Sequence, residues 1–68
     1  MMRLKVNGVE EDVAATTVSE LLATHGIDPS ARFVAVAVNG SVVRRSEWLC
    51  KPLGAGDDVE IVRPFSGG

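Results

Sequence analysis

The residues of this chain that could carry chemistry are few, and the last two are the most informative. The 68-residue chain ends in Gly67-Gly68. This pair has no turn to make and no helix to cap, so it presents a bare main chain that carries the α-carboxylate of Gly68. A tip without side chains can enter a narrow channel in another protein without steric cost. The pair therefore favours a role in which the terminal carboxylate is delivered to a partner.

The other reactive side chains do not form a catalytic or metal-binding set. Cys50 precedes Lys51, whose charge could activate the thiol, but a lone cysteine more often behaves as a small buried hydrophobic residue. His25 falls at the expected end of a helix, where a cation meets the partial negative charge of the terminus. One cysteine and one histidine cannot make a structural zinc site. A phosphate-binding glycine loop with its lysine is also missing. We therefore expect no catalytic residue, and no metal or cofactor bound by this chain.

Trp48 and the pair Arg44-Arg45 are the remaining candidates. We expect Trp48 to fill the core or to close its edge, and contact with a partner is its alternative role. Arg44-Arg45 is expected in a solvated loop, and steering of a partner is the alternative.

Composition narrows the class of protein. The formal net charge is −2 and no basic stripe is present, so nucleic acid is not an expected partner. No stretch approaches the ~20 apolar residues that span a bilayer, and the first residues lack a signal-peptide pattern. The single cysteine suits a reducing compartment. We expect a cytoplasmic binding, carrier or regulatory module rather than an enzyme, because so short a chain builds only a marginal core.

The first half of the chain predicts a hairpin followed by a short helix. Alternating apolar residues indicate half-buried strands over 2–6 and 9–13. Asn7-Gly8 joins them, since both central residues of a type I′ turn need positive φ. Thr17 and Glu20 have the spacing of a capping box, and the apolar residues that follow share one helical face. Gly26 ends this helix.

The second half predicts three more strands. The run 33–38 is apolar on both faces, which is typical of a central strand covered on both sides, or nearly so. Asn39-Gly40 turns it into a short strand over 41–43. The segment 46–49 fits either a brief helical turn or extended chain. The alternating run 58–62 is the last strand. One helix packed on one face of a mixed sheet of about five strands makes an α+β domain.

The division we expect is a domain over residues 1–63 and a flexible tail over 64–68. Pro64 cannot donate to a strand ladder, so the last strand stops before it. The five residues from Pro64 on reach roughly 16 Å when extended. The tip should be disordered in the free chain, and ordering it costs on the order of 1–2 kcal/mol per residue. A docking surface on the body must offset that cost, and we expect it on the apolar sheet face that the helix leaves open.

Taken together, these motifs resemble the thiamine-biosynthesis sulfur carrier family (ThiS). The resemblance rests on the run 36–48, which includes Asn-Gly and Ser-Glu-Trp, on Gly-Asp-x-Val-Glu-Ile within 56–62, and on Gly67-Gly68. The segments 6–8 and 17–22 also fit, so the likeness covers essentially the whole chain. It implies a ubiquitin-like β-grasp fold, which agrees with the order of elements above.

The resemblance also implies a function. An ATP- and Mg-dependent adenylating enzyme would activate the Gly68 carboxylate. Sulfur from a cysteine desulfurase or an equivalent donor would convert it to a thiocarboxylate, and thiazole synthase would take that sulfur. Gly68 would then be the point of covalent attachment. Pro64, Phe65, Ser66 and Gly67 would lie along the partner's channel, with Phe65 as the anchoring contact.

Three alternatives remain open from the residues alone. The small subunit of molybdopterin synthase also ends in diglycine, and Pro64 and Ser66 faintly fit its tail, although the segment 39–48 favours thiamine. A ubiquitin-like modifier would join its terminus to target lysines. A plain interaction module would keep its activity without Gly67 and Gly68.

Overall fold

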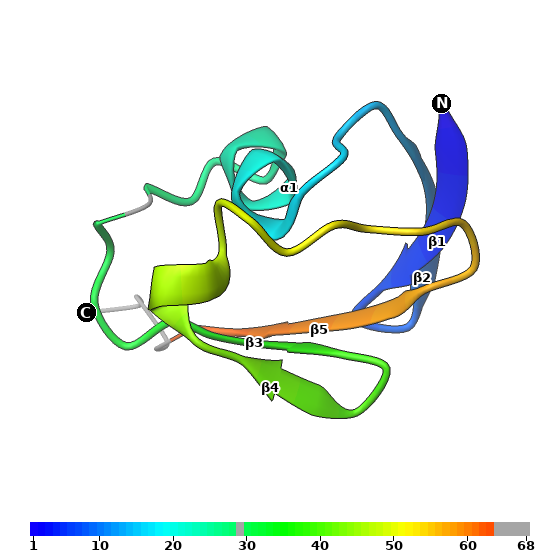
Figure 1. Cartoon of the computed structure of the whole chain (residues 1–68). Helices are drawn as coiled ribbons and strands as arrows, with labels where there is room; N and C mark the ends of the chain where they lie inside the picture. The colour runs from blue at the N-terminus through cyan, green and yellow to red at the C-terminus, as the bar shows by residue number, and fades with distance from the viewer. Residues whose placement is uncertain (29, 64–68) are drawn as a thin grey trace.

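Within residues 1–28 and 30–63, the part of the chain that this computed structural model describes, five strands form one mixed sheet and one α-helix crosses one of its faces (Figure 1). The strand order is β2-β1-β5-β3-β4. The β1–β5 pair is parallel, and the other neighbours are antiparallel. The elements are β1 (Met2–Val6), β2 (Val9–Val13), α1 (Val18–Thr24), β3 (Ala35–Val38), β4 (Ser41–Val43), the 3₁₀ turn η1 (Arg45–Glu47) and β5 (Asp58–Val62). The predicted α+β class is confirmed.

Both predicted hairpin turns are present. Asn7 and Gly8 have φ of 51° and 83°, and Asn39 and Gly40 have φ of 52° and 83°. Two consecutive residues with positive φ are what a type I′ turn requires, and its twist matches that of the flanking strands. The registers Val6↔Val9 and Val38↔Ser41 follow from these two-residue loops.

The turn asparagines also hold β5 in place. The Asn7 amide donates to the Val59 carbonyl at 2.9 Å, and the Ile61 amide donates to Asn7 Oδ1 at 2.8 Å. The Asn39 amide donates to the Asp58 carbonyl at 2.8 Å, and the Asp58 amide donates to Asn39 Oδ1 at 3.0 Å. The sequence pattern indicated the turns but not these contacts. The strand that leads to the tail is thus fastened at both hairpin tips.

The helix begins and ends where the sequence predicts. Thr17 is the N-cap, and its hydroxyl accepts the Glu20 amide at 3.2 Å. The Glu20 carboxylate accepts the Thr16 amide at 2.7 Å, so the first turn is closed from both sides. His25 is the C-cap, and Gly26 follows with φ of 75°, a conformation that favours glycine.

The core lies between α1 and one face of the sheet. Its fully buried side chains come from the helix and from strands β1, β3 and β5: Val18, Leu21, Leu22, Leu4, Val36 and Val59. Trp48 is 3% exposed and donates its indole N–H to the Val43 carbonyl at 3.1 Å. The expectation that Trp48 belongs to the core is confirmed, and the satisfied N–H makes its burial favourable.

The strand predicted over 33–38 is shorter and more open than expected. β3 begins at Ala35, and Phe33 lies before it with φ of 63° and 79% exposure. Val36 and Val38 are buried, whereas Ala35 is exposed and Ala37 half-buried. The prediction of a strand covered on both sides was therefore wrong. Its second apolar face points away from α1, and the central strand of the sheet is β5.

The segment after β4 shows which of two predicted conformations is present and where Cys50 lies. Residues 45–47 form the 3₁₀ turn η1, so the helical interpretation of this region holds. Cys50 is exposed, and the prediction that it would be buried was wrong. Trp48 and Leu53 take the inward positions of this segment, which leaves the thiol between them on the outside.

Candidate functional site

The predicted site residues lie outside the described residues: Pro64, Phe65, Ser66, Gly67 and Gly68. The structure places the body from which they continue. β5 ends at Val62, and Arg63 is the last described residue (Figure 1). Because β5 lies between β1 and β3, the last five residues start from the middle of the sheet. The described chain therefore ends on a strand that is held on both sides.

One half of the sheet face opposite α1 is apolar. Val42 and Val62 are 77% and 63% exposed, and the strand registers bring them beside Ala37 and Ala35. These four residues, here called the apolar patch, line a shallow hollow of about 180 Å³ together with Val36 and Glu60. Val62 ends β5, so the patch reaches the point from which the last residues leave. An apolar area at such a place suits a protein partner.

The other half of that face is charged. Arg3 on β1 binds Asp12 on β2 through two hydrogen bonds of 3.0 and 3.1 Å, and its third contact is Glu10 at 3.3 Å. The hydrogen bond from Arg3 lowers the pKa of Asp12, and the same bond raises the pKa of Arg3. Exposed pairs of this kind add little stability. They give the two halves of the face different chemistry, one charged and one apolar.

Phe33 is a candidate that the sequence did not reveal. Its ring is exposed, and its backbone lies in the left-handed region, which a bulky residue rarely adopts. Ala35 pairs with Val62 in an antiparallel register, and the next residues outward, Val34 and Arg63, line one hollow. An exposed aromatic side chain at the base of the tail is a typical anchor for a protein interface. The apolar run containing Phe33 carried no signal that separated it from the strand.

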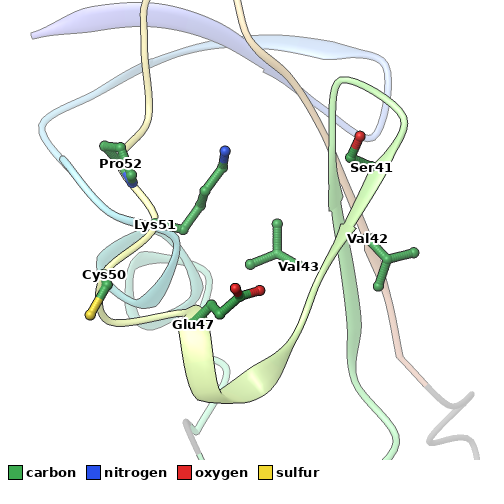
Figure 2. A pocket seen from close by; sticks show the side chains of 7 residues that line it. All are labelled: Ser41, Val42, Val43, Glu47, Cys50, Lys51 and Pro52. Carbon is green, nitrogen blue, oxygen red and sulfur yellow. The ribbon is translucent and has the colours of Figure 1, made fainter.

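The reactive side chains singled out earlier are not brought together. His25 Nε2 lies 3.1 Å from Glu11 Oε1, whereas Cys50 lies beside β4. A hollow of about 300 Å³ opens there. In Figure 2 the Cys50 thiol points away from Val43 and Ser41. Its lining residues are Ser41, Val42, Val43, Glu47, Cys50, Lys51 and Pro52. In residues 1–28 and 30–63, no group of three His, Cys, Asp or Glu residues is placed to hold a metal ion.

Arg44 and Arg45 are both exposed, as expected of a solvated pair, and Arg45 also contacts the body. Its guanidinium lies 4.5 Å from the centre of the Trp48 ring and donates to the Ala31 carbonyl. Arg44 is exposed, and its amide donates to Glu47 Oε1 at 3.3 Å. Arg45 thus covers the indole and connects η1 to the segment before β3. In the described part of the chain, no helix is long and apolar enough to cross a bilayer.

A model of the ThiS family matches residues 4–68. The chain belongs to the ThiS family. The matched range runs to the last residue and so includes the diglycine pair that lies outside the described residues. The family resemblance drawn from the motifs is therefore confirmed.

Solved structures agree with this assignment. The crystal structure of the thiamine biosynthesis protein ThiS from Geobacter metallireducens is similar, with 33% identity and a TM-score of 0.79, over 98% of this chain and 100% of that chain. The solution structure of a thiamine biosynthesis protein from the same organism gives 33% identity and a TM-score of 0.78, over 98% and 88%. No curated protein matches the chain. The expected ubiquitin-like β-grasp fold is confirmed.

Proposed function

We propose that this chain is the sulfur carrier for the thiazole ring of thiamine, and that it acts as a protein co-substrate rather than as an enzyme. The observation that carries the proposal is the match to the ThiS family, which extends to Gly68. The two similar structures are both thiamine biosynthesis proteins, which supports the same pathway.

The chemistry follows from the terminal carboxylate. A carboxylate is ionised at neutral pH and is a poor electrophile. An oxygen of the Gly68 carboxylate attacks the α-phosphorus of ATP in a Mg-dependent adenylating partner, pyrophosphate leaves, and an acyl adenylate forms. The terminal sulfur of the donor then attacks the acyl carbon and displaces AMP. Where the donor is the persulfide of a cysteine desulfurase, this step gives an acyl disulfide, and a thiol reductant cleaves its S–S bond, is itself oxidised to a disulfide and releases the thiocarboxylate. The product is a thiocarboxylate, whose sulfur thiazole synthase incorporates.

The residues of this chain present the terminal carboxylate to the partner enzymes and are recognised by them. Side chains at positions 67 and 68 would crowd the acyl carbon, so glycine at both keeps it open to attack. The apolar patch and Phe33 dock the adenylating enzyme, and the tail residues 64–67 lie along its channel. All catalytic groups belong to the partners.

The test is mass spectrometry of the intact chain after incubation with the adenylating enzyme, ATP, Mg²⁺ and the sulfur donor. We expect the mass to rise by the exchange of one oxygen for sulfur. Deletion of Gly67-Gly68, or addition of one residue after Gly68, should abolish this change, because the reactive carboxylate is moved. Sulfur transfer by the extended chain without trimming would contradict the proposal.

The same assay separates the alternatives. Incubation with the adenylating enzyme of molybdopterin synthesis should leave the mass unchanged if the chain serves thiamine. A ladder of isopeptide-linked products on target lysines would indicate a modifier instead.

A further inference from the structure

A second hollow lies on the α1 side of the sheet, at the end where β5 finishes. It has a volume of about 200 Å³ and opens between the segment that follows the helix and Arg63. Its floor consists of Ile27, which is buried, and of Ala31 and Val34, which pack against the core. The exposed Arg32 and Arg63 also line it. The hollow thus has an apolar floor between two cationic side chains.

Hydrogen bonds hold the floor of this hollow in shape. The Ile27 amide donates to the Leu22 carbonyl at 2.9 Å, and the Ala31 amide donates to the Asp28 carbonyl at 2.8 Å. The Arg45 guanidinium donates to the Ala31 carbonyl from η1, which lies at the same end of the molecule (Figure 1). Because the floor is formed before anything binds, a ligand that fills it pays little for ordering the chain.

The charge of the hollow is positive. In residues 1–28 and 30–63, Arg32 and Arg63 form no ion pair and no side-chain hydrogen bond. Asp28 also lines the hollow, but its carboxylate accepts the Ser30 amide and hydroxyl at 2.8 and 2.7 Å. Two guanidinium groups outweigh this carboxylate, although the formal net charge of the whole chain is −2. A positive site on an acidic protein favours an anionic ligand.

The combination of charge and apolar floor suits a protein side chain better than a small free anion. A guanidinium binds a carboxylate through two parallel N–H donors, so Arg32 and Arg63 are matched to aspartate or glutamate. A small anion would leave the floor of the hollow exposed to water. An acidic segment of a protein can cover that floor with an apolar side chain next to the carboxylate.

We propose that this hollow binds an acidic segment of the adenylating enzyme. A carboxylate of that segment pairs with Arg32 and Arg63, and an apolar side chain beside it covers the floor. This inference rests on the proposed function, in which the enzyme takes the chain beyond Arg63 into a channel. An enzyme that does so surrounds the end of β5, so it reaches the face with α1 as well as the apolar patch on the opposite face.

The first test measures association of the full chain with its adenylating enzyme. Arg32→Met and Arg63→Met each remove one positive charge and keep a side chain of similar length. Charges at the edge of an interface act mainly on the association rate, so each variant should associate about three- to tenfold more slowly at low salt. The difference from the unmodified chain should vanish toward about 1 M salt, because salt screens exposed charges. Arg32→Lys keeps the charge and should recover part of the rate.

Lys5→Met is the matched control for these variants. It removes the same charge from an exposed position on β1 that pairs with Asp58, at the opposite end of β5 from Arg63. Its association rate should equal that of the unmodified chain. Equal slowing by Lys5→Met would show that net charge governs association, and this would overturn the proposal. Arginine variants that associate as fast as the unmodified chain would also overturn it.

NMR cross-saturation locates the contact. The protonated enzyme is irradiated in complex with a deuterated, methyl-labelled chain. The methyl signals of Ile27, Ala31 and Val34 should lose intensity together with those of the apolar patch, whereas Val9 on β2 should keep its intensity. Loss of intensity at the apolar patch without loss at the floor of the hollow would refute the proposal.

Failure of this inference and failure of the proposed function give different results. Thiocarboxylate formation with no effect of the arginine variants and no saturation of the floor would refute the hollow alone. Arginine-dependent association and saturation of the floor, without thiocarboxylate formation by the unmodified chain, would refute the sulfur-carrier function alone.

Discussion

Asn7 and Asn39 lie at the tips of the two hairpins, and each also binds the last strand through its side chain. The positive φ of each asparagine satisfies the turn, while the side-chain oxygen takes an amide of β5 that has no strand partner at that point. Each asparagine thus fixes the conformation of its own turn and also attaches that hairpin to β5.

This double role predicts unequal effects of two substitutions at position 7. Asn7→Gly keeps the turn but leaves the half-buried Ile61 amide without its acceptor, so the free energy of unfolding should fall by about 1–2 kcal/mol. Asn7→Asp keeps an acceptor oxygen and should lose much less. Urea unfolding of the two variants measures the difference, and equal losses would show that the Ile61 contact is unimportant.

The backbone of Phe33 predicts a second effect at the residue scale. An L-residue in the left-handed region costs roughly 1–2 kcal/mol that glycine avoids. Since the ring is 79% exposed, its removal loses little packing. Phe33→Gly should therefore be more stable than Phe33→Ala by about 1 kcal/mol, as measured by thermal or urea unfolding. If the alanine variant proves equally stable, position 33 is not strained in solution.

At the scale of elements, hydrogen bonds from the backbone and from hydroxyls stabilise two carboxylates at the ends of α1. The amide of Thr16 is the main cause that lowers the pKa of Glu20, and the Ser30 hydroxyl is the main cause that lowers that of Asp28. A carboxyl whose pKa is lower in the folded state stabilises the fold above its unfolded pKa. That contribution is lost as the pH falls through the folded value.

Stability should therefore decline on the acid side, below about pH 4.5. Glu20→Gln removes the ionised acceptor, so its melting temperature should lie below that of the unmodified chain at pH 7. The two melting temperatures should converge as the pH falls through the lowered pKa of Glu20 in the folded chain. Thermal unfolding across this range checks the expectation, and a gap that persists in acid would show that ionisation of Glu20 is not the cause.

The elements were predictable to the extent that local patterns determine them. Asn-Gly pairs, the cap at Thr17 and the alternation in β1, β2 and β5 are local, and the structure confirms them. The run 33–38 misled because an apolar pattern does not distinguish a covered face from an apolar face left open. Cys50 misled because burial of a lone cysteine is a statistical preference, and here Trp48 takes the inward position.

At the scale of the whole molecule, the sequence predicts a chemistry for the candidate site but not the surroundings of the strand that leads to it. The diglycine pair pointed to Gly68 from its position alone. The apolar patch depends on strand order, because Val42, Ala37 and Val62 come from three different strands. Phe33 precedes Ala35 of the patch by two residues, and the pairing of Ala35 with Val62 brings that segment near the end of β5. Strand order brings these residues together, and local sequence patterns do not determine strand order.

The apolar patch predicts a binding defect without a folding defect. Val42→Glu puts a charge on an exposed position of the patch, so the KM of the adenylating enzyme for this chain should rise about tenfold, with kcat little changed. Val9→Glu is the matched control. Val9 is 62% exposed and lies on β2, the edge strand opposite to β4. Steady-state kinetics with both variants checks this. Equal effects of the two changes would exclude the patch as the docking surface.

The place of β5 between a parallel and an antiparallel neighbour has a mechanical consequence. A force applied at the C-terminus runs along the central strand and loads the ladders to β1 and β3 in shear at the same moment. Hydrogen bonds sheared together resist more than bonds unzipped one by one from an edge. We therefore expect the sheet to stay folded when a partner protein applies force to the chain through its terminal glycines.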